Sequence, residues 1–108
     1  MSTYDNFQTL DIRVGQVIAV DDFPEARKPA YKLTIDFGPL GIKTSSAQIV
    51  NYKKEDLFGR QVICIVNFPK KKIGPFVSEV LTLGAERDEG GYDLLRPDPT
   101  AALGKRIY

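Results

Sequence analysis

The sequence predicts an all-β domain that closes into a small barrel of five strands. Three observations support this prediction: segments in which apolar and polar residues alternate, short turns rich in glycine and proline, and a glycine inside the first strand. With 108 residues, of which 43% are hydrophobic, the chain can bury one modest core. We therefore expect a single domain over residues 1–108, with short flanking helices and terminal extensions around the barrel.

The chain begins with a short predicted helix and a long predicted strand. Ser2 or Thr3 can cap the helix, and Asp5 in its first turn favours the positive helix end. The segment Asp11–Phe23 is predicted to be a strand, with alternate apolar residues at Ile12, Val14, Ile18 and Val20. Gly15 lies inside this segment and predicts a sharp bend or a bulge of the kind that small barrels use.

The middle of the chain predicts two more strands and a second helix. Tyr31–Phe37 alternates apolar and polar residues throughout, as a half-buried strand does. The turn Gly38–Gly41 leads to another extended segment, Ile42–Ile49. Tyr52–Phe58 is predicted to be a short helix that ends at Gly59.

The last third of the chain predicts a hairpin whose connecting loop concentrates positive charge. Its strands are Arg60–Asn67 and Phe76–Gly84, and three consecutive lysines lie between them. After a turn at residues 88–91, Tyr92–Leu95 is predicted to be a last short strand. Five or more strands with short turns and little helix are typical of the OB-fold, which binds oligonucleotides or oligosaccharides across one face, between its loops.

Composition argues against several classes of function. The net charge is only +1, so any binding to nucleic acid has to come from local clustering of charge. The chain has no histidine, which removes the usual near-neutral general base and the commonest metal ligand. Cys64, the single cysteine, lies in the apolar run VICIV and is expected to be a buried structural thiol. We therefore predict no catalytic residue, no metal site and no cofactor.

The sequence also predicts where the chain acts. No window approaches the roughly 20 apolar residues that a membrane span requires, so we expect no membrane insertion. The first residues lack the basic and apolar regions of a secretory signal. A single cysteine fits a reducing compartment. We therefore expect a soluble cytoplasmic protein.

Lysine side chains are the candidates for binding charged ligands. The run Lys70, Lys71 and Lys72 either neutralises phosphates or attracts acidic peptide segments. The alternative is a solvated turn in which the lysines protect an exposed edge and keep it soluble. Lys32, on the polar face of its strand, is a further candidate contact to nucleic acid, or else an ordinary outward lysine.

Aromatic side chains are the candidates for binding apolar ligands. Phe23, Phe68 and Phe76 each lie beside a proline or in a turn, where burial is harder, so we predict that they form an exposed apolar pocket. Such rings suit two kinds of ligand, because they stack on bases and also anchor peptide side chains. A second apolar set, predicted to contact another subunit or to cover one end of the barrel, consists of Tyr4, Phe7 and Leu10.

Four segments and two single residues follow one another at characteristic spacings. They are Phe7–Gly15, Lys28–Leu33, Ser45–Ile49, Leu57–Val62, Asn67 and Ser78. Their order and spacing resemble the tRNA-binding domain family of OB-folds over nearly the whole chain. That family includes the C-terminal domains of some methionyl-tRNA synthetases and stand-alone bacterial proteins, and the resemblance is strongest to a stand-alone secretion-associated chaperone.

The resemblance implies a homodimer, unfolded or export-bound polypeptides as ligands, and contact with the Sec export machinery. Asn67, Lys72 and Ser78 keep their places in the pattern of the tRNA-binding members, which makes them candidate contacts to nucleic acid. However, Gly74 stands where that pattern has arginine. The loss of a guanidinium group that can form a bidentate contact with phosphate argues against strong tRNA binding. We therefore predict a non-enzymatic export chaperone, with structure-selective tRNA binding as the alternative.

Overall fold

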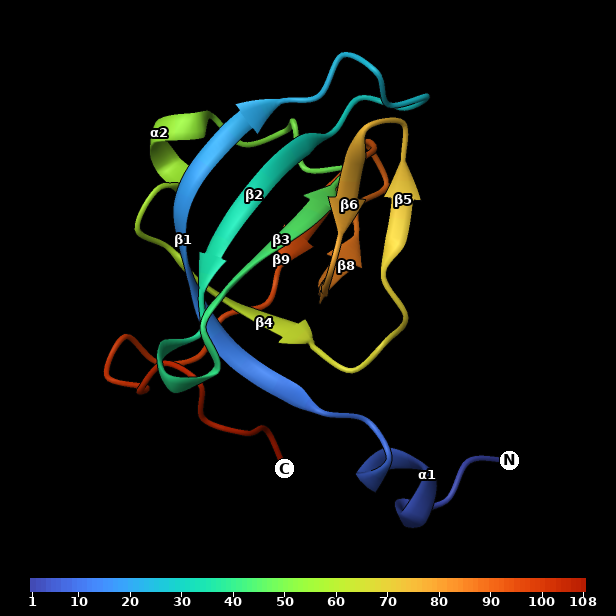
Figure 1. The fold of residues 1–108 in the computed structure, drawn as a ribbon, viewed down its shortest axis with the longest axis vertical. Coiled ribbons are helices and arrows are strands. Elements are labelled where there is room, and N and C mark those ends of the chain that lie inside the picture. The colour runs from blue at the N-terminus through green and yellow to red at the C-terminus, as the bar shows by residue number, and fades with distance from the viewer.

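A five-stranded antiparallel sheet curls into a nearly closed barrel in the computed structural model, which describes all residues from Met1 to Tyr108 (Figure 1). The strands follow the order β3-β2-β1-β4-β7 across the sheet. Their bounds are β1 Ile12–Asp22, β2 Tyr31–Asp36, β3 Ile42–Ala47, β4 Gln61–Ile65 and β7 Leu81–Thr82. The prediction of an all-β barrel of the OB-fold type is confirmed.

Thr44 of β3 closes the barrel against the segment that precedes β7. Its carbonyl oxygen accepts hydrogen bonds from the backbone N–H groups of Glu79, at 2.8 Å, and Val80, at 3.2 Å. Its own N–H donates to Glu79 Oε1 at 3.1 Å. The backbone N–H and C=O of Thr44 at the outer edge of β3 are therefore hydrogen-bonded within the chain. Such pairing keeps an edge strand from pairing with another molecule.

The prediction of one hairpin, with Arg60–Asn67 and Phe76–Gly84 joined by a lysine loop, is wrong in how the strands are connected. The lysine segment forms a strand of its own, β5 (Lys71–Ile73), which pairs with β6 (Phe76–Ser78). The predicted strand Phe76–Gly84 is divided into β6, β7 and β8 (Gly84–Glu86), and only β7 pairs with β4. This division follows from the barrel geometry, because β6 lies against β3 whereas β7 crosses to β4. The predicted last strand is β9 (Tyr92–Leu94), which pairs with β8.

A bulge in β1 changes which residues of this strand face the core. The register between β1 and β2 shifts directly after Val17, so the irregularity does not lie at Gly15. The shift places Val17 fully in the core and leaves Ile18 only partly buried, contrary to the simple alternation. Gly15 is required by packing, since a Cβ there would lie 2.5 Å from Ile35 Cγ2 and 2.8 Å from Phe37 Cε1.

Two short α-helices flank the barrel, as predicted. α1 (Tyr4–Gln8) begins with a capping box in which the Thr3 side chain accepts a hydrogen bond from a backbone N–H of the first turn. α2 (Lys54–Leu57) precedes β4 and ends before Gly59, whose φ is +83°. The predicted turn between β2 and β3 contains a 3₁₀ helix, Gly38–Leu40. None of these helices is long and apolar enough to cross a membrane.

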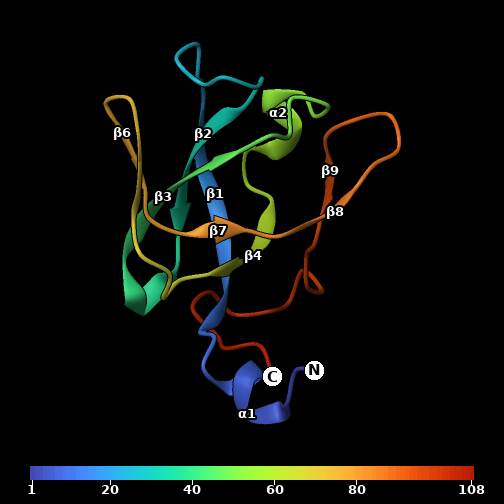
Figure 2. The ribbon, with the colours of Figure 1, turned by 90° about the vertical axis from the view of Figure 1, so that its right-hand side faces the viewer.

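Hydrophobic clusters lie on both faces of β1 and β4. The inner cluster, which fills the barrel, consists of Val17, Leu33, Ile35, Phe37, Ile49, Leu57, Val62, Cys64, Val80 and Leu94. The outer cluster consists of Ile12, Val14, Ile63 and Ile65. α1 and the C-terminal tail lie at the same end of the molecule (Figure 2) and cover the outer cluster. Leu83, between β7 and β8, also packs against this cluster. The other side chains that cover it are Phe7, Leu10, Ala101, Leu103 and Ile107.

Cys64 is a buried thiol, as the sequence predicts. Its side chain is fully buried, and its Sγ lies 3.5 Å from Thr82 Oγ1. The Thr82 hydroxyl in turn donates to Ser45 Oγ at 2.9 Å. Burial raises the pKa of Cys64 to about 12, against a smaller opposing effect of the contact with Thr82. The thiol therefore stays protonated at neutral pH.

Candidate binding face

The β1–β2 loop and the β5–β6 hairpin meet at one end of the barrel (Figure 1). The rings of Phe23 and Phe76 make an edge contact, with centroids 5.3 Å apart and planes at 65°. Lys32 Nζ, from β2, lies 5.6 Å from the centroid of Phe23 and 5.9 Å from that of Phe76. We call the surface formed by this loop, this hairpin and the outer side of β2 and β3 the binding face.

The structure does not form the predicted exposed pocket of three rings. Phe23 is only 4% exposed, because it packs against the ring of Phe76 and the ammonium group of Lys32. Phe76 is partly buried in the same contact. Phe68 is exposed, but it precedes β5 at the base of the hairpin, whereas Phe76 follows the turn at its tip. The expectation of exposure is therefore wrong for Phe23, and Phe68 lies apart from the ring pair.

Two of the three lysines, Lys71 and Lys72, lie in β5 instead of in an open loop, and Lys70 directly precedes the strand. Lys70 pairs with Glu79, with 3.5 Å between Nζ and Oε2. Lys71 and Lys72 are exposed and take part in no ion pair. Lys72 lies directly opposite Val77 in the β5–β6 register. A free ammonium group and an exposed apolar side chain therefore share one face of the hairpin.

Sequence reasoning missed Thr44 and Glu79, which attach the hairpin to the barrel. Thr44 Oγ1 lies 2.7 Å from the carbonyl oxygen of Val77 and 3.0 Å from Glu79 Oε1. Burial by itself raises the pKa of Glu79, but hydrogen bonds from Thr44 and the charge of Lys70 outweigh it and hold the pKa below its ordinary value. The available signal is an acidic residue inside the apolar run Phe76–Gly84.

Ile42 is a third functional candidate that the sequence did not reveal. It lies on β3 two residues before Thr44, on the same side of the strand, and its side chain is exposed. Val77, whose carbonyl oxygen contacts the Thr44 hydroxyl, is also exposed. Ile42 and Val77 therefore place apolar surface on both sides of the junction between β3 and β6. The sequence pattern around Ile42 is too irregular to show which side of the strand faces solvent.

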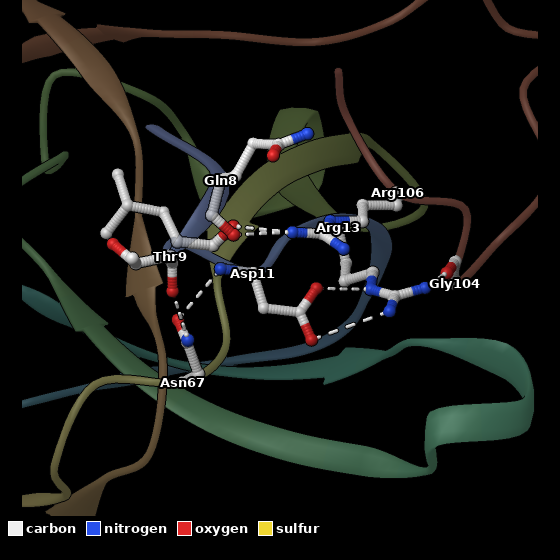
Figure 3. Close-up of polar contacts among 8 residues, drawn as sticks. Gln8, Thr9, Asp11, Arg13, Asn67, Gly104 and Arg106 are labelled. Atoms are coloured by element: carbon white, nitrogen blue, oxygen red, sulfur yellow. Dashed lines mark hydrogen bonds and ion pairs between the residues drawn. The ribbon is translucent and has the colours of Figure 1, made fainter. Parts of the chain in front are cut away.

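Asn67 and Ser78 direct their polar atoms into the protein itself. Asn67 Oδ1 accepts a hydrogen bond from the N–H of Asp11 at 2.9 Å, and its Nδ2 donates to the carbonyl of Thr9 at 2.8 Å (Figure 3). Ser78 is buried, and its Oγ accepts a hydrogen bond from the N–H of Ser46 at 3.0 Å. Both side chains thus position the backbone, Asn67 at the N-terminal segment and Ser78 at the junction of β6 with β3.

The predicted subunit contacts differ in how much of each side chain remains free. Tyr4 is exposed, whereas Phe7 and Leu10 are partly buried against the outer cluster of the same chain. The carbonyl groups of Gln8 and Leu10 accept hydrogen bonds from Arg106 Nη2, at 2.9 Å and 3.3 Å, which ties α1 to the C-terminal tail (Figure 3). Beside the outer cluster, Leu81 of β7 remains exposed.

A family model described as "Putative tRNA binding domain" matches residues 12–106 of the chain. Among curated proteins, the methionine–tRNA ligase of Methanocaldococcus jannaschii is 36% identical over 100 residues, which cover 93% of this chain and 15% of the ligase. Methionine–tRNA ligase 1 of Sorangium cellulosum is 39% identical over 107 residues, which cover 98% of this chain and 15% of that enzyme. The chain therefore spans about a seventh of the length of these relatives.

Solved structures resemble the chain over its full length. The CsaA chaperone protein from Picrophilus torridus has a TM-score of 0.95 and 52% identity, and each chain covers 100% of the other. The chaperone CsaA from Bacillus anthracis has a TM-score of 0.94 and 47% identity, covering 100% of this chain and 99% of that one. A MetRS-related protein from Pyrococcus horikoshii has a TM-score of 0.87 at 26% identity, covering 100% and 98%. The chain belongs to the tRNA-binding domain family, and among the solved structures it is similar to CsaA chaperones.

Proposed function

We propose that this protein is a non-enzymatic chaperone that binds unfolded polypeptides as a homodimer. One observation carries the proposal: the binding face exposes the apolar side chains of Ile42 and Val77, and the unpaired ammonium group of Lys72 lies on the same face of the hairpin as Val77. Exposed apolar surface next to charge suits a chain segment that mixes apolar and acidic residues. The likeness to two CsaA chaperones at 52% and 47% identity supports the same function.

In this mechanism, apolar client segments bind against Ile42 and Val77, while the lysines of β5 attract acidic residues on either side of the segment. No bond is made or broken, so release follows from competition or from transfer to a partner. A homodimer presents two such faces on one particle. Linked weak sites gain roughly 10²–10⁴ in avidity without any new contact, provided that one client spans both.

Export is the cellular setting that we propose for this binding. The sequence resemblance to a stand-alone secretion-associated chaperone of the family supports clients that await export, with transfer to the Sec export machinery and action in the cytoplasm. A precursor polypeptide that carries its signal segment, held unfolded, is therefore the preferred client. If the protein binds this precursor no better than an unfolded chain that is never exported, the export part of the proposal fails.

Suppression of client aggregation tests the chaperone function. The variant Val77→Ser removes apolar surface from the binding face, and we expect it to lose most of the ability to suppress aggregation of a denatured client. Leu95→Ser is the control, because Leu95 is 46% exposed, similar to Val77 at 40%, and directly follows β9, which lies across the barrel from β6 (Figure 2). Equal loss in both variants, or no loss in Val77→Ser, would contradict the assignment of clients to the binding face.

Binding of tRNA is the second candidate function. Lys71 and Lys72 support it, because they carry two unpaired positive charges on one strand, and the family model supports it as well. We expect the double variant Lys71→Glu, Lys72→Glu to lower tRNA affinity and to reduce the slope of log affinity against log salt by about 1.4–1.8, from two phosphate contacts at roughly 0.7–0.9 each. A salt slope near zero in the wild-type protein would exclude this function.

A further inference from the structure

A second concave site lies away from the binding face, where the connection from α2 to β4 meets the C-terminal tail. In Figure 1 α2 and the β5–β6 hairpin stand on opposite sides of the barrel. The cavity has a volume of about 380 Å³, within the range of roughly 300–1,000 Å³ that small-molecule sites occupy. The side chains that line it and bear on its chemistry are Gln16, Asp56, Phe58, Arg60, Gln61 and Arg96.

Hydrogen bonds within the chain orient the two glutamine side chains of this cavity. Gln61 Nε2 donates to the carbonyl of Ala101 at 2.8 Å, and Gln16 Nε2 donates to the carbonyl of Gly59 at 3.0 Å. With its amide nitrogen held in this way, Gln61 has a buried Oε1 with no hydrogen-bond partner. Because this oxygen is closed to solvent, Gln61 shapes the wall of the cavity, and the exposed carboxylate of Asp56 is the acceptor that a ligand can reach.

Arginine side chains give the cavity an excess of positive charge. Arg60 lies over the ring of Tyr52, with 5.0 Å from its Cζ to the ring centroid, and its Nε is buried without a hydrogen-bond partner. Neither Arg60 nor Arg96 takes part in an ion pair, and Asp56 has no cationic partner either. Two guanidinium groups against one carboxylate favour an anion whose other end donates hydrogen bonds.

Phe58 adds a flat apolar surface to the cavity. Its ring is exposed, and it is the one hydrophobic side chain in the lining. Exposed aromatic rings of this kind stack on nucleobases, which all present a π-face. The lining therefore combines two guanidinium groups that suit phosphate, a carboxylate that accepts hydrogen bonds from hydroxyl groups, and a stacking surface.

We propose that this cavity binds a 5′-mononucleotide. Arg60 and Arg96 bind the phosphate, because guanidinium groups pair well with phosphate oxygens. The exposed carboxylate of Asp56 accepts hydrogen bonds from the ribose hydroxyls, a role that carboxylates commonly have in nucleotide sites. The base stacks on Phe58. The same phosphate chemistry is found in a free nucleotide and in the 5′-phosphorylated end of an RNA.

Titration with AMP tests the proposal, using the intact protein and following backbone amide resonances by NMR. We expect saturable shifts at residues of the cavity, with adenosine and inorganic phosphate each at least roughly tenfold weaker, because each lacks one half of the ligand. Arg96→Gln and Phe58→Ser alter exposed side chains, and both should weaken AMP binding by about tenfold or more. Arg27→Gln, which removes the same charge from an exposed position on the β1–β2 loop, is the control and should bind AMP as the wild type does.

The result that overturns the proposal is AMP binding that is unsaturable, that shifts residues of the binding face instead, or that survives in both Arg96→Gln and Phe58→Ser. Competition then identifies the source of the nucleotide. A short 5′-phosphorylated RNA that displaces AMP assigns the cavity to RNA ends, and failure to displace it assigns the cavity to free nucleotides. Because the cavity lies away from Val77, Arg96→Gln should leave suppression of client aggregation unchanged.

Discussion

Phe23 and Phe76 meet edge to face, with ring centroids 5.3 Å apart, and this contact joins the β1–β2 loop to the β5–β6 hairpin. Two connections that are remote in the sequence thereby become one surface. Lys32 lies over both rings, so its ammonium group adds a cation–π interaction to the aromatic contact. The orientation of the hairpin, and with it the position of Val77 and Lys72, depends on this cluster.

Phe76→Ala should detach the hairpin from the β1–β2 loop. A fully buried phenylalanine costs about 3–5 kcal/mol when truncated to alanine, and Phe76 is only partly buried, so we expect a loss of about 1–3 kcal/mol in the free energy of unfolding. Urea denaturation measures this loss. Phe68→Ala, at an exposed position at the base of the hairpin, is the control with an expected loss under about 1 kcal/mol. Equal losses would show that the ring pair does not hold the hairpin.

Asn67→Ala should release the N-terminal segment from the end of β4. The variant loses the hydrogen bonds to Asp11 N and Thr9 O, so we expect a loss of roughly 1–2 kcal/mol in the free energy of unfolding. Amide hydrogen exchange at Asp11 should accelerate at the same time. Asn51→Ala, which breaks a single side-chain hydrogen bond to Tyr92 O, is the control. Unchanged exchange at Asp11 in Asn67→Ala would contradict the positioning role of Asn67.

Leu81→Asp should dissociate the proposed homodimer. Leu81 lies beside the outer cluster and is 44% exposed in the single chain, and burying a carboxylate in an apolar interface is costly. We expect the dissociation constant of the dimer to rise by about tenfold or more, measured by sedimentation velocity. Leu40→Asp, at a position 39% exposed on the turn between β2 and β3, should leave the dimer intact. A wild-type protein that sediments as a monomer at all concentrations would refute the dimer itself.

Ionisation of Cys64 should weaken the fold only at high pH. Burial raises the pKa of the folded thiol to about 12, above the value of 9.0 for a free thiol, so the unfolded chain loses this proton first. The contribution of Cys64 to stability is therefore complete below pH 9 and is lost as the pH rises towards 12. Comparison with Cys64→Ala isolates this effect, with a difference in slope of up to about 1.4 kcal/mol per pH unit. Parallel pH profiles of the two proteins would contradict it.

Protonation of Glu79 should loosen the junction between the hairpin and β3 in acid. Hydrogen bonds from Thr44 and the charge of Lys70 hold the pKa of Glu79 below its ordinary value of 4.5 despite the opposing effect of burial. Its contribution to stability is therefore present above pH 4.5 and is lost as the pH falls through the lower folded pKa. Glu79→Gln should unfold with a flatter dependence on pH in this range. If the acid profile of Glu79→Gln matches that of the wild type, Glu79 does not stabilise the junction.

Local sequence pattern was sufficient to predict most of the barrel. Tyr31–Phe37 alternates so regularly that β2 and the burial of Leu33, Ile35 and Phe37, which directly follows β2, can be predicted from the residues alone. The capping signal before α1 and the glycine after α2 act over a few residues, so they too are visible in sequence. The burial of Cys64 follows from its place in an apolar run.

What the sequence did not predict depends on contacts between remote segments. Gly15 signalled a bend, but the bulge at Val17 arises from pairing with β2, which no local pattern contains. Phe23 was expected to be exposed because proline follows it, yet the hairpin folds over and covers it. Likewise, Asn67 and Ser78 were predicted to contact a ligand. In the structure their side-chain oxygens instead accept hydrogen bonds from backbone N–H groups of distant parts of the chain.

The sequence by itself thus determined β1 to β4, the two short helices and the lack of histidine chemistry, because these depend on residue identity and on neighbours within a few positions. The division of the segment after β4 into β5 to β8 depends on which strands meet in the barrel. Only the tertiary structure decided which polar and aromatic side chains remain free for a partner. Closure of the barrel brings β3, β6 and the β1–β2 loop together, and the resulting contacts engage Ser78 and Phe23. The N-terminal segment engages Asn67 at the end of β4. Val77 and Lys72 are left exposed.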